Sequence, residues 1–449
     1  MAATVPRVRL VVLAYNGGDM VVRCLEHLRG LDWPADRLEL VVVDNASADG
    51  SDRVIAERFP DVRLMRNGTN GGFPANNLAL RDLDGVDYVG LVNQDSFVEP
   101  GWLAPLVAAL EADPTVGAVS ARMLFAERFV EVAIASPTFT PGGADQRALG
   151  VMVSGARVDG KDRWRDTQFG EGTWGIEHDR RGGTFQWTRK RAVVRVPVPD
   201  GVAQPDEVQL RLAAEAPKPV TVGTGSAATT VTVGPEPGWV TVPVTGAPID
   251  VVNNVGSVVF DDGYGADRGY LEPDVGQYDE PADVFAWCGG SVLFRPVYLA
   301  DVGLFDERFF LYYEDTDLSW RGLARGWRHR YVPDAVARHL HATSTGEGTP
   351  IFQHYVERNR LLMLTKNAPA PLARRAVLLF VLVTASYARR DIVRPLLRLH
   401  RPNVTQVRRR IGSFLAYLRL APAMLADRRR LRARAALGDD EVTARLTPR

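Results

Sequence analysis

Three carboxylates stand within four positions in the last third of the chain: Glu314, Asp315 and Asp317. They follow an aromatic stretch that ends at Tyr312 and Tyr313. Because like charges at this spacing repel one another, one carboxyl group could hold a raised pKa and act as a general base. The alternative is structural, since acidic residues favour the first turn of a helix, where they face the positive end of its dipole.

Polar residues also follow apolar runs in the N-terminal third of the chain. Three runs have the length and composition of buried parallel strands: residues 8–14, 38–43 and 88–92. Helical spacing at 20–29 and a helix beginning near Ala75 alternate with them, which predicts an α/β fold with a parallel, doubly wound sheet. Ligands of such sheets bind beyond the carboxyl ends of the strands. The residues placed there are Tyr15, Asp44, Asn93 and Asp95.

These residue types suit a sugar nucleotide. The ring of Tyr15 can stack on a base, and Asp44 can accept a hydrogen bond from a pyrimidine ring N–H. A carboxylate at Asp95 can hold a divalent metal that neutralises a diphosphate leaving group. Each residue also has a structural interpretation, as a strand-end, turn or capping residue. Their joint order along the chain favours the ligand site.

Together these stretches resemble the family 2 glycosyltransferases of GT-A fold, and within them the bacterial rhamnosyl- and galactofuranosyltransferase-like enzymes that build cell-envelope glycans. The resemblance covers residues 8–126 and 249–366. The stretches that carry it are Val11-Val-Leu-Ala-Tyr-Asn16, Val42-Val-Asp-Asn-Ala-Ser47, Asn70-Gly-Gly-Phe73, Leu91-Val-Asn-Gln-Asp-Ser96, Gly289-Gly-Ser-Val-Leu-Phe-Arg295 and the segment from Phe310 to Arg321.

The resemblance implies a role for each matched residue. Asp315 matches the catalytic base, with Glu314 beside it. Asp95 matches the last acid of the metal-binding DxD motif, whose first acid is replaced by Asn93, and His339 is the second expected ligand of Mg²⁺ or Mn²⁺, with His341 as its competitor. The residues expected to bind the nucleotide sugar are Tyr15, Asp44, Asn45, Gly71, Gly72, Asn77 and Asn93. Those expected on the acceptor side are Trp287, Gly289, Gly290, Asp317 and Trp320.

The implied reaction is inversion by a single displacement. Asp315 would take the proton of an acceptor hydroxyl as its oxygen attacks the anomeric carbon of a nucleotide-diphosphate sugar. The expected acceptor is a cell-envelope glycan or a polyprenyl-linked precursor. The alternative is a catalytically silent glycan-binding or scaffold protein that keeps the fold. A nucleotidyltransferase would need a basic residue near Tyr15, and the stretch up to Asp19 has none.

An inserted domain interrupts the α/β pattern. Period-two apolar alternation between Gly/Pro clusters predicts an antiparallel β sandwich at residues 127–248, within a transferase domain formed by 1–126 and 249–370. Four side chains of the insert could offer a sugar-stacking face or belong to the core or rim of the sandwich: Trp164, Trp174, Trp187 and His178. Whether the insert binds glycan, contacts a partner or shapes the acceptor cleft stays open.

The C-terminal tail, residues 371–449, is predicted to be helical and basic, with 18 Arg and 5 acidic residues and a net charge of +13. Its apolar runs cover 376–388 and 411–426. Since a membrane span needs about 20 apolar residues, the first run is short for one. The helices could lie on anionic lipid or pack on the catalytic domain with a solvated arginine face.

The composition sets further bounds. The formal net charge of zero gives no indication of nucleic-acid binding. Cys24 and Cys288 lie far apart and outside any metal motif, so we expect reduced, buried thiols. The first strand is too short for the apolar core of a signal peptide. We therefore expect a cytoplasmic protein, located at the inner face of the cell membrane.

Overall fold

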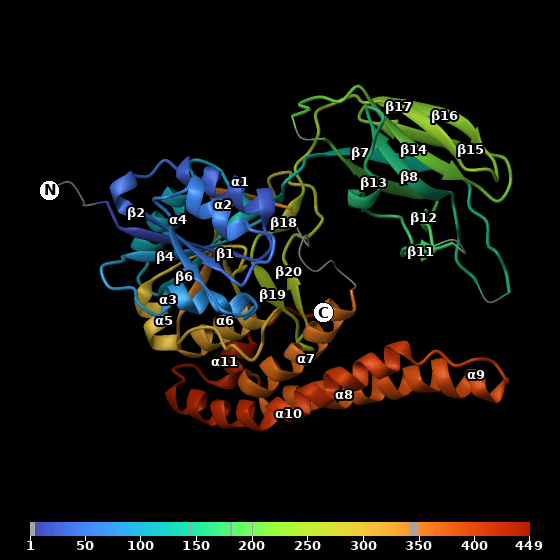
Figure 1. Ribbon diagram of the computed structural model, residues 1–449. Helices are drawn as coiled ribbons and strands as arrows, with labels where there is room; N and C mark the ends of the chain where they lie inside the picture. The colour runs from blue at the N-terminus through green and yellow to red at the C-terminus, as the bar shows by residue number, and fades with distance from the viewer. Residues whose placement is uncertain (1–4, 144, 180–181, 200, 341–348) are drawn as a thin grey trace. The chain divides into compact units, whose positions relative to one another are not determined.

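The computed structural model describes residues 5–143, 145–179, 182–199, 201–340 and 349–449. The chain divides into two compact units, an α/β unit formed by residues up to 124, 253–270 and 276–449, and a β unit formed by 125–252 and 271–275. Figure 1 shows the first as a sheet with helices and the second as mainly strands. The predicted class, α/β with an inserted all-β sandwich and a helical tail, is confirmed.

A ten-stranded sheet forms the centre of the α/β unit. One side of it is parallel, in the order β4-β1-β2-β3. These strands are β1 (Val8–Ala14), β2 (Leu38–Asp44), β3 (Arg63–Arg66) and β4 (Tyr88–Asn93). Most of their valines and leucines are buried, as expected for strands covered by helices, and Leu13, Leu38 and Leu64 are part-exposed. The helical elements of this half are α1 (Gly18–Arg29), η1 (Ala35–Arg37), α2 (Ser51–Arg58), η2 (Phe73–Asn76), α3 (Asn77–Leu80) and α4 (Leu103–Ala112).

The parallel sheet predicted from the N-terminal strands continues into antiparallel strands. Strand β22 (Ser291–Phe294) lies between β4 and β6 (Val116–Phe125) and runs antiparallel to both. Its start, at Ser291, therefore pairs with Val92 near the end of β4. This reversal brings the Gly289-Gly290 turn to the edge where the parallel strands end. The remaining strands of the unit are β5 (Ser96–Val98), β18 (Val252–Asn254), β19 (Ser257–Val259), β20 (Gly265–Asp267), β21 (Ala282–Val284) and β23 (Arg328–His339).

The second half of the α/β unit is mostly helical. Its helices are α5 (Pro296–Val302), α6 (Glu314–Ala324), α7 (Pro350–Asn367), α8 (Ala370–Ala388), the π-helix η4 (Arg389–Val393), α9 (Arg394–Leu397), α10 (Thr405–Arg434) and α11 (Asp439–Thr443). Helices α8 and α10 lie side by side as a long hairpin whose tip is α9 (Figure 1). Helix α10 packs most heavily on α7, which in turn contacts α6.

The β unit is a sandwich of two antiparallel sheets over one core of buried aliphatic side chains. One sheet holds β7 (Phe129–Ala135), β10 (Gln168–Phe169), β13 (Arg191–Pro197), β15 (Lys218–Thr224) and β16 (Ala227–Val233). The other holds β8 (Met152–Val158), β9 (Lys161–Asp162), β11 (Glu177–His178), β12 (Thr184–Trp187), β14 (Glu207–Ala213) and β17 (Gly238–Pro243), with the short helix η3 (Trp164–Asp166) beside β8.

Candidate active site

Tyr15 lies directly after β1, at the edge where the parallel strands end. The registers pair Ala14 with Asp44 and Leu13 with Asn93, so the polar residues that follow the three strands share this edge. The Gln94 side chain holds the backbone of Tyr15, accepting from its N–H at 2.9 Å and donating to its carbonyl at 3.1 Å. The Tyr15 side chain is 41% exposed. Its ring is thus presented to solvent from a fixed backbone, as base stacking requires.

Asp44 is buried at the end of β2. Among the described residues, none donates a hydrogen bond to its Oδ1 atom. A buried carboxylate oxygen without a donor is costly, and a ligand N–H would satisfy it. Asp44 therefore has the surroundings expected of a residue that binds a base.

The side chain of Asn45 makes hydrogen bonds inside the protein, whereas the resemblance implies that it binds the nucleotide sugar. Its Oδ1 accepts from Asn67 Nδ2 and from the backbone N–H of Gly71, at 3.1 and 2.9 Å, and its Nδ2 donates to Asn70 Oδ1 and to the carbonyl of Gly72. All its polar atoms are used inside the protein. Asn45 fixes the shape of the loop that follows β3.

This loop is fastened to the segment that precedes α6. Gly72 adopts a φ of +67°, and a Cβ atom there would lie 1.9 Å from the Phe310 carbonyl oxygen, which accepts from the N–H of Phe73 at 2.8 Å. Asn77 exchanges two hydrogen bonds with the backbone of Phe305. Gly72 and Asn77 thus join two parts of the chain that lie more than 200 residues apart, and the Asn77 amide is used for that contact.

Glu314 and Asp315 begin helix α6. The two interpretations of the acidic cluster, an acidic first helical turn and a pair of interacting carboxylates, therefore apply to the same residues. Glu314 is buried, and burial together with the charge of Asp315 raises its pKa well above the ordinary value. Burial also raises the pKa of Asp315 to about 6, although hydrogen bonds from Thr316 and from the Gly289 amide oppose the shift. Asp315 is part-exposed. A part-exposed carboxylate with a pKa near 6 can accept a proton at neutral pH.

The turn before α6 is strained and clamped. Phe310, Tyr312 and Tyr313 all have φ between +66° and +68°, which costs free energy for residues with a Cβ. Asn359, fully buried in α7, donates from Nδ2 to the carbonyls of Phe309, Leu311 and Tyr312 at 2.7–2.8 Å. This single amide holds the turn from which Glu314 and Asp315 project.

Asp317 does not face the acceptor side. Its side chain has 0% exposure. Its Oδ2 accepts from Arg321 Nε at 2.9 Å and from Lys366 Nζ at 2.8 Å, and its Oδ1 accepts from Asn367 Nδ2 at 2.8 Å. The carboxylate thus ties α6 to the end of α7 and is enclosed by protein.

The two tryptophans expected on the acceptor side are core residues. Trp287 packs edge-to-face against Phe294 and Phe305, with ring centroids 4.8 and 6.0 Å apart, and Trp320 packs against Phe285 at 5.1 Å. Both are almost fully buried, so neither ring can stack on a sugar without rearrangement.

Gly289 and Gly290 serve close packing at the same edge. A Cβ on Gly289 would lie 2.9 Å from Phe73, and one on Gly290 would lie 2.7 Å from Met123. The Gly290 carbonyl accepts from the N–H of Asn93 at 3.1 Å. Because the Gly289 amide hydrogen-bonds with Asp315, this turn connects the end of β4 to the candidate base.

The two expected metal ligands lie together. His339 Nε2 is 3.1 Å from Asp95 Oδ1, and His339 Nδ1 is 3.1 Å from Asn253 Oδ1. When Nδ1 of the imidazole donates a hydrogen bond to Asn253, the lone pair of Nε2 points at the Asp95 carboxylate oxygen, and the two electron-rich atoms repel each other. A proton or a cation bound by both atoms removes this repulsion. The pair therefore fits a divalent cation. No group of three or more His, Cys, Asp or Glu ligands is gathered in the described ranges, and His341 lies outside them.

Three residues important to this geometry escaped the sequence analysis: Gln94, Asn253 and Asn359. A polar residue inside an apolar pattern could have indicated Asn253, which lies in a buried strand after two valines. Asn359 stands between charged residues on α7 and Gln94 lies between Asn93 and Asp95, so no such pattern marks either of them. Neither cysteine joins the site as a nucleophile, because both are free thiols whose pKa is raised by burial.

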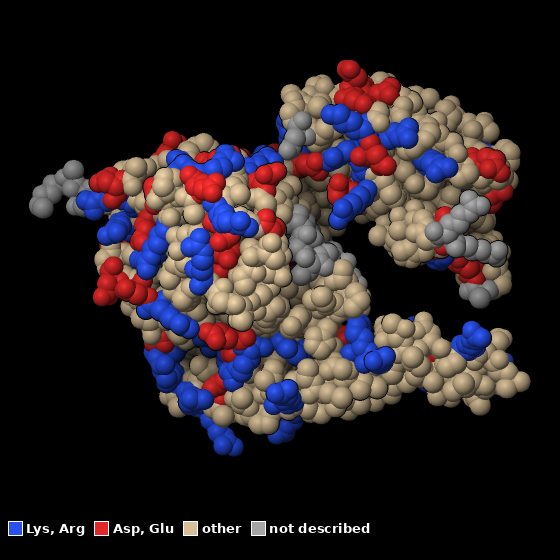
Figure 2. Space-filling model, viewed as in Figure 1, with Lys and Arg blue, Asp and Glu red and all other residues tan. Residues whose placement is uncertain are grey.

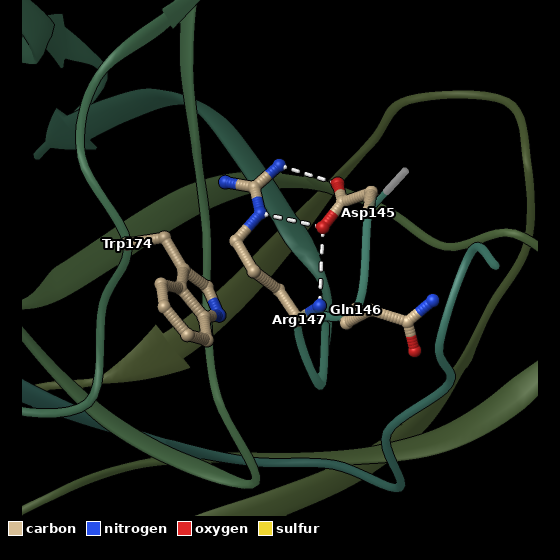
Figure 3. A pocket seen from close by; sticks show the side chains of 4 residues that line it. All are labelled: Asp145, Gln146, Arg147 and Trp174. Atoms are coloured by element: carbon tan, nitrogen blue, oxygen red, sulfur yellow. Dashed lines mark hydrogen bonds and ion pairs between the residues drawn. The ribbon is translucent and has the colours of Figure 1, made fainter. Parts of the chain in front are cut away.

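The β unit has a surface depression of its own. It is lined by Asp145, Gln146, Arg147 and Trp174 (Figure 3). The Arg147 guanidinium is already paired with Asp145 and with Glu177, at 2.7 Å each. Trp164 and Trp187 instead pack against aromatic neighbours of the sandwich, and His178 is exposed. Of the four candidate sugar-stacking residues, Trp174 alone lines the depression.

Comparisons with known proteins find similarity to glycosyltransferases. Residues 10–153 match the model of the family described as Glycosyl transferase family 2. A β-monoglucosyldiacylglycerol synthase of Synechocystis is 32% identical over 35% of this chain and 33% of its own length. An N-acetylglucosaminyl-diphospho-decaprenol L-rhamnosyltransferase of Mycobacterium tuberculosis is 48% identical over 13% of this chain and 20% of its own. The chain thus spans at most a third of the length of these relatives.

The segment 10–153 is thus similar to family 2 glycosyltransferases, as the motifs predicted. Among solved structures, GalNAc-T7 with UDP, GalNAc and Mn²⁺ is similar with a TM-score of 0.44 and 13% identity, over 81% of this chain and 49% of that one. Within the described parts of the chain, no helix is both long and apolar enough to cross a bilayer.

Proposed function

We propose that the protein is an inverting glycosyltransferase that moves a sugar from a nucleotide-diphosphate donor to an acceptor hydroxyl, with Asp315 as the general base. The observation that carries this proposal is the link through the Gly289-Gly290 turn. Gly290 accepts from the N–H of Asn93 and Gly289 hydrogen-bonds with Asp315. This connection supports a donor site at the strand ends that lies beside a carboxylate able to accept a proton.

The nucleotide would bind through Tyr15 and Asp44. The exposed ring of Tyr15 supports stacking on the base, and the Asp44 Oδ1 atom supports a hydrogen bond from a ring N–H. Asn45, Gly71 and Gly72 would act indirectly, because they shape and anchor the loop after β3. Asn77 would act in the same indirect way, since its amide is paired with Phe305.

A divalent metal, Mg²⁺ or Mn²⁺, would be held by Asp95 and His339. Such a cation would neutralise charge on the leaving diphosphate. Asn253 would keep the imidazole of His339 in the ligating orientation. Asn93, which stands where the motif usually has an acid, would contribute through its backbone contact with Gly290.

We propose that the acceptor is a cell-envelope glycan or a polyprenyl-linked precursor. We also propose that the protein belongs to the rhamnosyl- or galactofuranosyltransferase-like branch. The two named relatives act on lipid or lipid-linked molecules, as their names state. A cytoplasmic location at the inner face of the membrane follows from such an acceptor. The alternative is a catalytically silent glycan-binding protein, which would keep the strand-end site without needing the raised pKa of Asp315.

The test is turnover of a donor panel by the wild type, Asp315→Asn and a matched control, Asp334→Asn, which alters an exposed aspartate on β23. The panel is dTDP-rhamnose, UDP-galactofuranose, UDP-glucose, UDP-N-acetylglucosamine and GDP-mannose, with Mg²⁺ or Mn²⁺ and with polyprenyl-diphosphate-linked acceptors. We expect one donor to turn over, and Asp315→Asn to lower kcat by about 10³-fold or more while Asp334→Asn does not. Equal activity of Asp315→Asn and the wild type would exclude Asp315 as the base.

A further inference from the structure

Helix α10 has two apolar faces. One face is buried and includes Val407, Tyr417 and Met424. On the other, Ile411, Leu415, Leu418, Pro422 and Leu425 follow a spacing of three and four residues and are all exposed. A second apolar stripe on a helix that is already packed through its first face needs another partner to cover it.

The tip of the hairpin is still more exposed. Leu397 in α9 is 80% exposed and Leu399, just beyond it, is 96% exposed. Val393 and Leu396 are about half exposed beside them. Single exposed apolar residues are common on proteins. A group of four exposed apolar residues at a protruding end is typical of a docking surface.

The charge around these apolar residues is mostly positive. Between Ile392 and Ala426 the sequence has seven arginines and no Asp or Glu, and two of the seven, Arg409 and Arg410, pair with Glu357 of α7. Arg394, Arg398 and Arg401 surround the tip, and Arg408 and Arg419 flank the stripe of α10. In Figure 2 the hairpin shows mainly tan surface with blue arginine side chains and little red.

This combination fits an anionic lipid surface. Exposed leucines can enter the boundary between headgroups and acyl chains, while arginines bind lipid phosphates and keep their charge at the interface. We propose that the α8–α10 hairpin is a peripheral membrane-docking element, with Leu396, Leu397 and Leu399 at its inserting tip and the Ile411–Leu425 stripe as its lipid-facing side. A second copy of the chain would explain the leucines, but like-charged arginine surfaces would repel each other.

The hairpin is joined to the helix that holds the candidate active site. Arg410 of α10 pairs with Glu357 of α7, and Tyr417 and Thr365 share a hydrogen bond of 3.0 Å. Helix α7 also carries Asn359, which clamps the turn before Asp315. The inference deepens the proposed membrane location, and it does not depend on catalysis, because lipid binding is measured without donor or acceptor.

The test is co-sedimentation of the full chain with vesicles of phosphatidylcholine, alone or with about one third phosphatidylglycerol, at low and high salt. Wild type should bind the anionic vesicles and lose binding at high salt. Leu397→Ser with Leu399→Ser should weaken the affinity by about tenfold for each leucine removed. The matched control is Val297→Ser, an exposed apolar residue of α5 outside the hairpin, which should bind like wild type.

A second measurement tests whether the tip of the hairpin enters the lipid. Leu399→Cys, labelled with an environment-sensitive dye, should report an apolar environment when anionic vesicles are added. Labelling should be selective because Cys24 is buried and burial raises the pKa of Cys288. The proposal is overturned if wild type does not sediment with anionic vesicles. It is also overturned if the dye stays in water, or if the leucine variants instead dissociate a dimer without changing vesicle binding.

Discussion

At the scale of single residues, the acidic cluster separates into three different groups. Glu314 is buried with a raised pKa, Asp315 is part-exposed with a pKa raised to about 6, and Asp317 is enclosed by cations. Adjacent positions on a helix point about 100° apart, so neighbours in sequence enter different surroundings. The candidate base is therefore the one acid of the three that combines exposure with a raised pKa.

The pH dependence of turnover tests this assignment. Burial raises the pKa of Asp315 from 3.8 to about 6, so the carboxylate form needed to accept a proton is lost as the pH falls below about 6. We expect kcat/KM of the wild type to fall about tenfold per pH unit on the acid side of that value, because this ratio reports the pKa values of the free enzyme. A profile of kcat/KM between about pH 3.5 and about pH 8 measures it, with circular dichroism checking the fold at each pH. An acid limb only near about pH 4, the ordinary value for an aspartate, would contradict a raised pKa of Asp315.

Replacing Asp317 tests its structural role. Asp317→Asn leaves Lys366 and Arg321 without their shared carboxylate in a buried site, so we expect a loss of about 3 kcal/mol in the free energy of unfolding. Urea unfolding measures this loss. For enzyme that remains folded, we expect an unchanged KM for the acceptor. A raised acceptor KM with unchanged stability would instead support the acceptor-side role implied by the resemblance.

At the scale of elements, the site depends on a loop and a turn that meet face to face. Asn45 shapes the loop after β3, Gly72 lets that loop touch the Phe310 carbonyl, and Asn359 clamps the turn from the other side. The strained φ values of the turn persist because these contacts fix the backbone. The loop after β3 and the turn before α6 are thus held together by backbone contacts.

A glycine pair tests this fastening. Gly72→Ala would place a Cβ 1.9 Å from backbone and at a φ of +67°, so we expect a loss of about 2 kcal/mol or more in stability and weaker nucleotide binding. Gly68→Ala in the same loop has no atom within 4 Å of the new Cβ and is the matched control. Thermal unfolding and titration with a nucleoside diphosphate measure both effects. Equal behaviour of the two variants would mean that the contact with Phe310 is unimportant.

At the scale of the whole molecule, each of the two units has hydrophobic clusters of its own. The sandwich has its own aliphatic core, and the sheet and helices of the α/β unit have others. Where the chain enters and leaves the sandwich, Phe125 N–H donates to the Val251 carbonyl at 2.9 Å, and Phe129 pairs with Ile249. Because its two ends lie together, the insert can be shortened without stretching the chain.

Calorimetry tests this independence. We expect two unfolding transitions for the wild type, because each unit buries its own core. Replacing residues 130–248 by a short Gly/Ser linker should remove one transition and leave donor hydrolysis within about threefold of wild type. A variant that no longer folds, although the linker spans the closed ends, would show that the sandwich is needed for the stability of the α/β unit.

The sequence by itself determined much of the local structure. Mostly apolar runs ending in polar groups, at residues 8–14, 38–43 and 88–92, are sufficient to predict β1, β2 and β4, because a strand buried on both faces needs such a run. Period-two alternation predicted the strands of the sandwich, and the arginine content predicted a basic helical tail. The motifs also predicted the similarity to family 2 glycosyltransferases that the match over residues 10–153 shows.

Only the tertiary structure decided the direction of β22 and the use of each polar side chain. Strand direction depends on where a chain returns to the sheet, which residues 291–294 do not encode locally. Likewise, the sequence gives the position of an Asn or Asp but does not show whether its side chain faces a ligand or a group of the protein. Asn45, Asn77 and Asp317 have partners 22 to 228 residues away. Such partners come from folding, and they distinguish the residues that hold the site from those placed to act in it.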